Sequence, residues 1–174
     1  MKAMDVGFER FEENFYAQNT FICGSTATLL NEASTQLAKL SAAGNTVLVT
    51  DPYLFPSSPD SVYQRDLISI LKGLNAAKIT YCAKTKRNAG FYQQVELALQ
   101  ASGTVLDFSN QLDDCHDRFW YCPETEKCVV FGTSLNGIGR KICRIDMLTA
   151  EETAELKRYF VNSGIITSGD SCGA

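Results

Sequence analysis

The sequence predicts a single α/β domain built on a mixed β-sheet. Short β-branched apolar runs alternate with stretches of helical periodicity through the first two thirds of the chain. Such alternation implies right-handed crossovers and a largely parallel sheet. Three strand-like runs then follow one another without a helix between them, which favours antiparallel pairing. At 174 residues, the chain is long enough for one domain with a hydrophobic core and too short for two domains.

The first segment, residues 1–44, is predicted to be an N-terminal arm followed by a first helix. Its aromatic-rich part, from Glu12 to Cys23, is typical of a strand or an extended arm. Thr28–Ala42 carries leucines at helical spacing, and Gly44 follows as a helix stop. The polar, acidic beginning of the chain has no apolar stretch of the kind that a secretory signal needs.

Residues 45–162 are predicted to form the α/β domain itself. The run Asn45–Thr50 is typical of a buried parallel strand, and it ends before Pro52, which cannot extend a strand ladder. Thr149 and Glu152 form a capping-box pattern at the start of the last helix. The other elements are expected, in chain order, as a helix over Ser61–Leu74, a strand over Ala77–Ala83, a helix over Phe91–Ala101, a strand over Thr104–Ser109, a hairpin of 116–122 and 127–132 around a turn, a strand over 141–145, a helix from Thr149 to Val161 and a flexible tail over 163–174.

Composition limits the possible functions. Hydrophobic residues make up 45% of the chain and charged residues 21%, as in folded globular proteins, and no apolar run is long enough to span a membrane. The net charge of −4 excludes a broad basic face of the kind that binds phosphate polymers. Basic side chains instead occur in two local groups: Lys84, Lys86 and Arg87, and then Arg140, Lys141 and Arg144.

The seven cysteines indicate a reduced, intracellular protein. Several occur within strand-like runs, which is typical of buried thiols rather than of a disulfide framework. Cys115, His116, Cys122 and Cys128 lie close in sequence, but they include no Cys-x-x-Cys pair and match no familiar zinc spacing. We therefore expect a cytoplasmic protein with no metal and no other cofactor.

His116, the only histidine, is the centre of the candidate site. On a regular strand, His116, Arg118 and Trp120 would share one face because side chains alternate. An imidazole beside a guanidinium can act as a nucleophile or proton carrier next to an anion clamp; the alternative is an inert, half-exposed edge pair. The loop Gly132–Gly137 follows the partner strand and offers backbone, hydroxyl and amide donors to an oxyanion, unless it is an ordinary polar turn.

These features together resemble a known signature. His116-x-Arg118 is followed, after thirteen residues, by Gly132-Thr133-Ser134-Leu135-Asn136. This pattern is similar to the motif of the phospholipase D superfamily, which reads His-x-Lys, four residues, Asp, six residues, Gly-Ser-x-Asn. More closely, the runs HDRFW and FGTSLNGIGRK, with the early turn Asp51-Pro52-Tyr53, resemble a branch of bacterial phospholipase D-like domains. The resemblance extends over residues 45–161.

The resemblance implies a role for each matching residue. His116 would attack phosphorus and form a phosphohistidine without a metal. Arg118, in place of the family lysine, would bind the phosphate oxygens. Further contacts to the phosphate are implied for Gly132, Thr133, Ser134 and Asn136, with Arg140 and Lys141 on the rim of the site.

Two departures from the family pattern affect this expectation. Pro123 occupies the position of the family Asp and cannot orient a histidine by hydrogen bonding. One motif is present where the family site uses two histidines, so activity would require a homodimer in which two His116 side chains meet. Candidate replacements for the Asp are Asp113, Asp114, Glu124 and Glu126.

The sequence therefore favours a metal-independent phosphodiesterase, a nuclease that works as a homodimer. The alternative is a catalytically degenerate module that binds nucleic acid or another anionic phosphodiester as part of a larger protein. A structural domain with an inert His116 is the third possibility. We expect no membrane partner.

Weaker substrate contacts are assigned outside the motif. Asp51 ends a strand, where α/β folds place ligand sites, although a simple turn carboxylate is the alternative. Trp120 could stack on a base or pack in the core. The basic loop, which could steer a phosphate polymer or be merely solvated, contains Lys84, Lys86 and Arg87.

Overall fold

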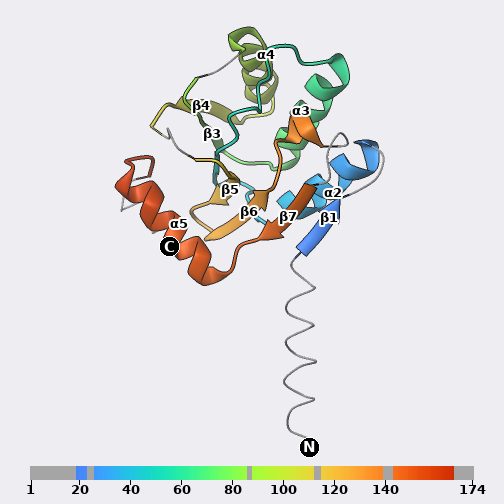
Figure 1. Ribbon diagram of the computed structural model, residues 1–174. Helices are drawn as coiled ribbons and strands as arrows, with labels where there is room; N and C mark the ends of the chain where they lie inside the picture. Colours follow the sequence, from blue (N-terminus) through green and yellow to red (C-terminus); the bar gives the residue numbers. More distant parts are fainter. Residues whose placement is uncertain (1–18, 23–25, 86–87, 112–114, 139–142, 167–174) are drawn as a thin grey trace, which may run out of the picture.

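A seven-stranded mixed β-sheet forms the centre of the molecule, with strand order β1-β7-β6-β5-β2-β3-β4 (Figure 1). The computed structural model describes residues 19–22, 26–85, 88–111, 115–138 and 143–166. The predicted fold class, a single α/β domain with a mixed sheet, is confirmed. The elements are β1 (Asn19–Ile22), α2 (Thr26–Ala38), β2 (Thr46–Val49), α3 (Ser61–Gly73), β3 (Lys78–Cys82), α4 (Ala89–Gln100), β4 (Val105–Ser109), β5 (Arg118–Cys122), β6 (Lys127–Phe131), the 3₁₀ helix η1 (Leu135–Gly137), β7 (Cys143–Met147) and α5 (Ala150–Asn162).

The strand directions bring several strand ends to one edge of the sheet. β2, β3 and β4 are parallel, as the helix–strand alternation predicts. β5 is antiparallel to both β2 and β6, and β7 is antiparallel to both β6 and β1. Consequently β1, β2, β3, β4 and β6 all finish at the same edge, which we call the carboxyl edge, and β5 and β7 start there.

Helices cover the two faces of the sheet unequally. The larger core lies between the sheet and α2, α3 and α4, and it includes Val49, Tyr81 and Trp120. The smaller core lies under α5, where Tyr121 and Phe160 pack with ring centroids 5.7 Å apart. Figure 1 shows α5 set apart from the other three helices. Neighbouring residues of β5 thus face different cores, as strand geometry requires.

Local sequence signals account for most of these elements. The predicted hairpin is present, with Arg118 opposite Phe131 and Cys122 opposite Lys127. The predicted capping box is also present: the Thr149 hydroxyl accepts from the Glu152 amide, and the Glu152 carboxylate accepts from the Thr149 amide.

The two end segments of the chain contribute to this fold within the described residues. β1 pairs with β7, and α2 packs on the larger core, so part of segment 1–44 belongs to the sheet and its helical layer. At the other end, the amides of Ile165 and Ile166 donate to the Phe160 carbonyl oxygen, and Ile166 packs in the smaller core. Residues 167–174 of the predicted tail lie outside the described residues.

Candidate functional site

The carboxyl edge gathers three segments that are distant in sequence. Asp51 follows β2, residues 115–117 lead into β5, and Gly132–Ile138 follows β6. The edge where parallel strands end is the usual ligand-binding edge of α/β sheets. The motif residues of β5 and of the loop after β6 are therefore brought together by the hairpin, as the sequence predicts.

Asp51 is the most deeply buried polar group at this edge, with none of its surface exposed. Its Oδ1 accepts a hydrogen bond of 3.0 Å from the Tyr53 amide. Burial raises the pKa of the Asp51 carboxyl above its ordinary value. Groups that oppose this rise in pKa are the Ser134 hydroxyl, the Tyr53 amide, the Arg118 guanidinium and the Leu135 amide. Asp51 therefore faces Arg118 at the start of β5 and the loop after β6, in addition to its own turn.

Arg118, at the start of β5, lies between Asp51 and the loop after β6. Its Nη1 donates to the Gly132 carbonyl oxygen at 3.5 Å, a long hydrogen bond. Its Cζ lies 6.0 Å from the centroid of the Tyr53 ring. The side chain is half-buried, so its charge is partly shielded from water while part of the guanidinium stays accessible.

Three polar atoms of this group are buried without a hydrogen-bond partner among the described residues: Asp51 Oδ2, Arg118 Nε and Ser134 Oγ. The Ser134 hydroxyl lies near enough to Asp51 to affect its pKa, but the pair does not reach hydrogen-bonding geometry. An unpaired buried polar group costs about 1–3 kcal/mol. We refer to the three residues as the Asp51–Arg118–Ser134 cluster. Its arginine and serine can both donate to an anionic oxygen.

The loop after β6 is a compact turn that holds Ser134 in place. The Gly132 amide donates to the Arg144 carbonyl oxygen at 2.9 Å, and the Gly137 amide donates to the Ser134 carbonyl oxygen at 2.7 Å. A Cβ on residue 137 would lie 2.6 Å from Thr133 Oγ1, so any side chain there would require Thr133 to move. Ser134 is buried, whereas Thr133 and Asn136 are half-buried.

His116 lies in the loop that precedes β5, and its side chain is exposed. The prediction that His116 and Arg118 share a strand face is wrong in its premise, because β5 begins only at Arg118. The reason is Thr50: its Oγ1 accepts from the Phe119 amide at 2.9 Å and donates to the Asp117 carbonyl oxygen at 3.2 Å. The Thr50 amide still donates to the Phe119 carbonyl oxygen at 2.9 Å, so the hydroxyl takes the place of one backbone acceptor where β2 ends.

Cys115 is the other reactive group beside His116. Its thiol lies 3.3 Å from the Asp117 carbonyl oxygen and 3.7 Å from Thr50 Oγ1. Burial raises the pKa of the Cys115 thiol, so it stays protonated at neutral pH and is a poor nucleophile. Among the residues that the structure describes, no three His, Cys, Asp or Glu side chains are grouped as metal ligands.

Position 123 lies far from His116. β5 is five residues long and separates the two positions by about 16 Å or more, at ~3.3 Å per residue. Pro123 is buried, and Glu124 accepts a hydrogen bond from the Thr46 amide at the start of β2. Glu126 pairs with Lys157 of α5. No side chain at positions 123–126 can therefore orient His116 within one chain, and the proline removes nothing from the site. Asp113 and Asp114 lie outside the described residues.

The weaker candidates have mixed outcomes. Trp120 is fully buried, with its ring centroid 6.1 Å from that of Phe131, which favours the packing alternative. Lys84 is exposed and follows β3 at the carboxyl edge. Arg144 forms an ion pair with Asp146 on β7. Four predicted basic residues lie outside the described part of the chain: Lys86, Arg87, Arg140 and Lys141.

Tyr53 is a site residue that sequence reasoning did not single out. It was visible only as part of the Asp51-Pro52-Tyr53 turn, and nothing in its local pattern indicates exposure or a basic neighbour. In the structure its side chain is 42% exposed and lies against Arg118.

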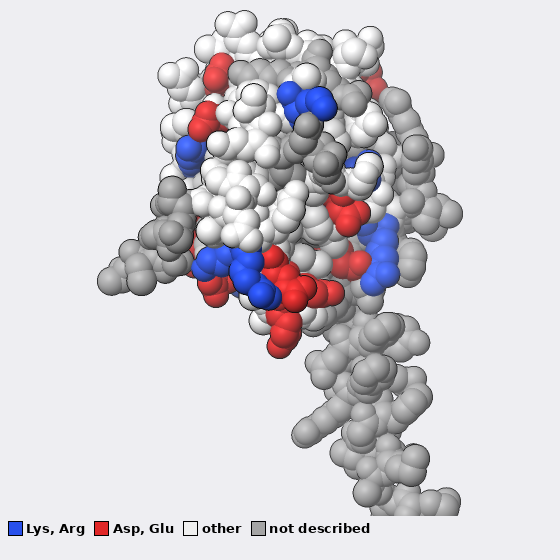
Figure 2. All heavy atoms as spheres, turned by 60° about the vertical axis from the view of Figure 1, so that its left-hand side comes forward, with Lys and Arg blue, Asp and Glu red and all other residues white. Residues whose placement is uncertain are grey.

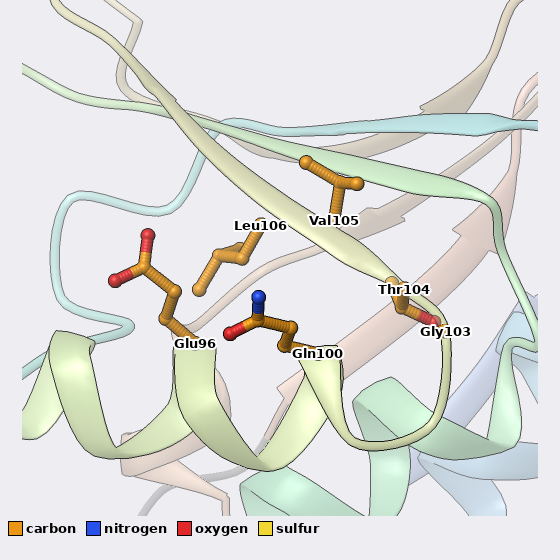
Figure 3. A pocket seen from close by; sticks show the side chains of 6 residues that line it. All are labelled: Glu96, Gln100, Gly103, Thr104, Val105 and Leu106. Carbon is orange, nitrogen blue, oxygen red and sulfur yellow. The ribbon is translucent and has the colours of Figure 1, made fainter.

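Neither the surface around α5 (Figure 2) nor the groove beside α4 has the basic lining that a phosphate site needs among the described residues. Figure 2 shows the α5 side of the molecule, where basic and acidic side chains lie beside each other in the lower part of the view. A groove of about 270 Å³ lies between α4 and β4. In Figure 3, Glu96 and Gln100 project from α4 toward Val105 and Leu106. The lining of this groove carries one acidic and no basic side chain, which does not suit an anionic ligand.

Comparisons with known proteins support the fold. No protein-family model and no curated protein matches the chain. Polyphosphate kinase from Porphyromonas gingivalis is similar in structure, with a TM-score of 0.53 and 10% identity over 90% of this chain and 27% of that chain. Phosphatidylserine synthase from Haemophilus influenzae Rd KW20 has a TM-score of 0.47 and 17% identity over 84% of this chain and 36% of that chain.

The archaeal chromatin protein TrmBL2 has a TM-score of 0.45 and 14% identity over 94% of this chain and 61% of that chain. At such identities the likeness concerns the fold alone, and the kinase, with its TM-score above 0.5, supports the α/β fold with a mixed sheet. The chain spans less than two thirds of each of these proteins. Within the described residues, none of the helices has the length and apolar character needed to cross a membrane.

Proposed function

We propose that the protein is a phospholipase D-like phosphodiesterase that cleaves nucleic acid as a homodimer, with His116 as the nucleophile. The observation that carries this proposal is the Asp51–Arg118–Ser134 cluster. Two of its members, Arg118 and Ser134, are the motif residues that resemble phosphate ligands. Arg118 is half-buried and Ser134 is buried, and both carry hydrogen-bond donors. The exposed His116 lies two residues before Arg118, on the same edge of the sheet.

The reaction would proceed in two displacements. In the first, a ring nitrogen of His116 forms a bond to phosphorus, the bond from phosphorus to the leaving oxygen breaks, and that oxygen takes a proton from the His116 imidazolium of a second copy. In the second, water attacks phosphorus, its proton passes to the second imidazole, and the phosphorus–nitrogen bond breaks. Arg118 and Ser134 would stabilise the negative charge on the phosphate oxygens in both steps.

The supporting physical argument concerns charge. A phosphodiester carries one negative charge, which a half-buried guanidinium neutralises better than an exposed one because the surrounding dielectric constant is lower. The donors are positioned before the substrate binds, since the turn after β6 is fixed by its own hydrogen bonds. Neither step needs a metal ion.

The first test is hydrolysis of bis(p-nitrophenyl) phosphate and of single-stranded DNA in excess chelator. We expect the His116→Ala variant to lose activity by at least about a thousandfold, because the nucleophile is removed. Gln94→Ala changes an exposed side chain of α4 and serves as the control with unchanged activity. Turnover that is equal in wild type and His116→Ala would contradict the proposal.

A second candidate function is a phosphodiester-binding module without turnover. Two observations favour this alternative. Arg118 stands where the phospholipase D motif has lysine, and the chain contains one such motif instead of two. Its signature would be salt-sensitive binding of DNA, with no cleavage by the wild type at any protein concentration. The Arg118→Ala variant would then lose binding, whereas His116→Ala would keep it.

A further inference from the structure

The turn after β2 presents one exposed aromatic side chain on a rigid support. The Leu54 amide donates to the Asp51 carbonyl oxygen at 3.0 Å, and the Tyr53 amide donates to the Asp51 carboxylate at 3.0 Å. The Leu54 carbonyl oxygen accepts from the Tyr63 hydroxyl at 2.8 Å. Leu54 and Phe55 are buried in the larger core. The backbone of Tyr53 is therefore held on both sides while its side chain stays 42% exposed.

A rigid tyrosine is well suited to bind a flat, apolar surface. Its ring offers a large contact area, and only two side-chain torsions lose freedom when a ligand binds. The folded turn has already fixed the backbone, which lowers the entropic cost further.

The position of Tyr53 relative to Arg118 indicates what that ligand is. The guanidinium Cζ lies 6.0 Å from the ring centroid, at the limit of a cation–π contact. Arg118 is the proposed phosphate ligand, so a molecule bound here presents a phosphate to the arginine and its adjoining group to the ring. A nucleotide has this shape, because its planar base is joined to the phosphate through one sugar.

Other aromatic side chains do not fit this role. Trp120 is fully buried in the larger core. Among the described residues, Tyr159 is the other exposed aromatic side chain. It lies on α5, on the face of the sheet opposite to the larger core, and its ring packs beside that of Phe160.

We propose that Tyr53 is the base-stacking residue of the site and that the substrate is single-stranded nucleic acid. This inference rests on the proposed function. Aromatic side chains stack on unpaired bases of any sequence, whereas the bases of a duplex are stacked on one another and cannot offer a face to the ring. Selectivity would then arise from strandedness and the presence of a base, without a sequence preference.

The test measures binding by fluorescence anisotropy, separately from cleavage. The ligands are an oligothymidylate, an abasic oligomer of the same length and a duplex of the same length. We expect wild type to prefer the oligothymidylate over both other ligands. Tyr53→Ala should weaken oligothymidylate binding about tenfold and leave abasic binding unchanged. Tyr53→Trp should keep the preference, and Tyr159→Ala should leave all three affinities unchanged.

A second variant separates stacking from folding. Tyr53→Leu keeps an apolar side chain on the turn but has no π-face, so it should lose the base preference as Tyr53→Ala does. Equal affinity of the wild type for the base-containing and abasic oligomers, or for single strand and duplex, would overturn the inference. So would a base preference that survives in Tyr53→Leu. Failure of the proposed function appears elsewhere, as cleavage of bis(p-nitrophenyl) phosphate that does not depend on His116.

Discussion

At the scale of single residues, Asp51 sets the electrostatics of the candidate site. A fully buried carboxylate is costly, and here it faces one guanidinium, one hydroxyl and two amides. Arg118 attracts the carboxylate of Asp51 electrostatically, and its Nη1 also donates to the Gly132 carbonyl oxygen of the turn after β6. We regard Asp51 as a positioning residue, because it acts through Arg118 and Ser134.

The raised pKa of Asp51 has a consequence for stability. The ionised carboxylate is disfavoured in the folded state, since burial raises the pKa above the value of 3.8 expected in the unfolded chain. The contribution of Asp51 to stability is therefore fully present below pH 3.8 and is lost as pH rises through the raised pKa of its carboxyl. Asp51→Asn removes this loss while its side-chain oxygen can still accept from the Tyr53 amide.

We expect urea unfolding to show this difference. The free energy of unfolding of Asp51→Asn minus that of wild type should be larger at pH 7 than at pH 4. A stability difference between the two proteins that is the same at both pH values would contradict the assigned pKa shift. Asp60→Asn, at an exposed helix cap, provides the comparison for a carboxylate outside the cluster.

At the scale of elements, the turn after β6 depends on close packing between its own residues. The Thr133 side chain lies against Gly137, and the Gly137 amide donates a hydrogen bond to the Ser134 carbonyl oxygen. The turn carries Ser134 into the cluster, so its shape determines where the hydroxyl lies.

A substitution tests this packing. Gly137→Ala should destabilise the protein by about 1–3 kcal/mol, because the new Cβ would lie 2.6 Å from Thr133 Oγ1. In a Thr133→Ala background the same change should cost much less, since the clashing oxygen is gone. Denaturant unfolding of the four proteins in this cycle gives the coupling energy.

Gly73→Ala is the matched control for the turn. No atom lies within 4 Å of a Cβ on residue 73 at the end of α3, so this change should not destabilise the protein. Additive effects of Gly137→Ala and Thr133→Ala would show that the two residues do not constrain each other.

At the scale of the whole molecule, the proposed chemistry needs two chains. One polypeptide supplies one histidine, and the two displacements need a nucleophile and a proton donor. A two-fold dimer is the simplest assembly that brings two identical groups together. His116 is exposed in the single chain, as a residue that must meet its copy has to be.

Dilution tests the dimer. Specific phosphodiesterase activity should fall as the protein is diluted, in step with dissociation measured by analytical ultracentrifugation. Activity per chain that stays constant while the protein is monomeric would contradict the requirement for a second copy. Gln94→Ala should follow the wild-type curve.

The sequence alone determined the features that depend on local patterns. The alternation of apolar runs with stretches of helical periodicity indicated the parallel strands and their helices. The turn at residues 123–126 indicated the hairpin of β5 and β6, and Thr149 with Glu152 indicated the cap of α5. The hairpin in turn placed the loop of Ser134 beside Arg118. These features could be predicted because the interactions that define them join residues near one another in the chain.

Tertiary structure decided the rest of the site. β5 begins at Arg118 because Thr50 bonds to residues about seventy positions away, an arrangement that no local pattern encodes. The same pairing of β2 with β5 buries Asp51, brings Arg118 to it and leaves Tyr53 exposed beside the guanidinium. Burial and charge contacts of this kind arise only when distant strands meet, and they give the cluster its chemistry.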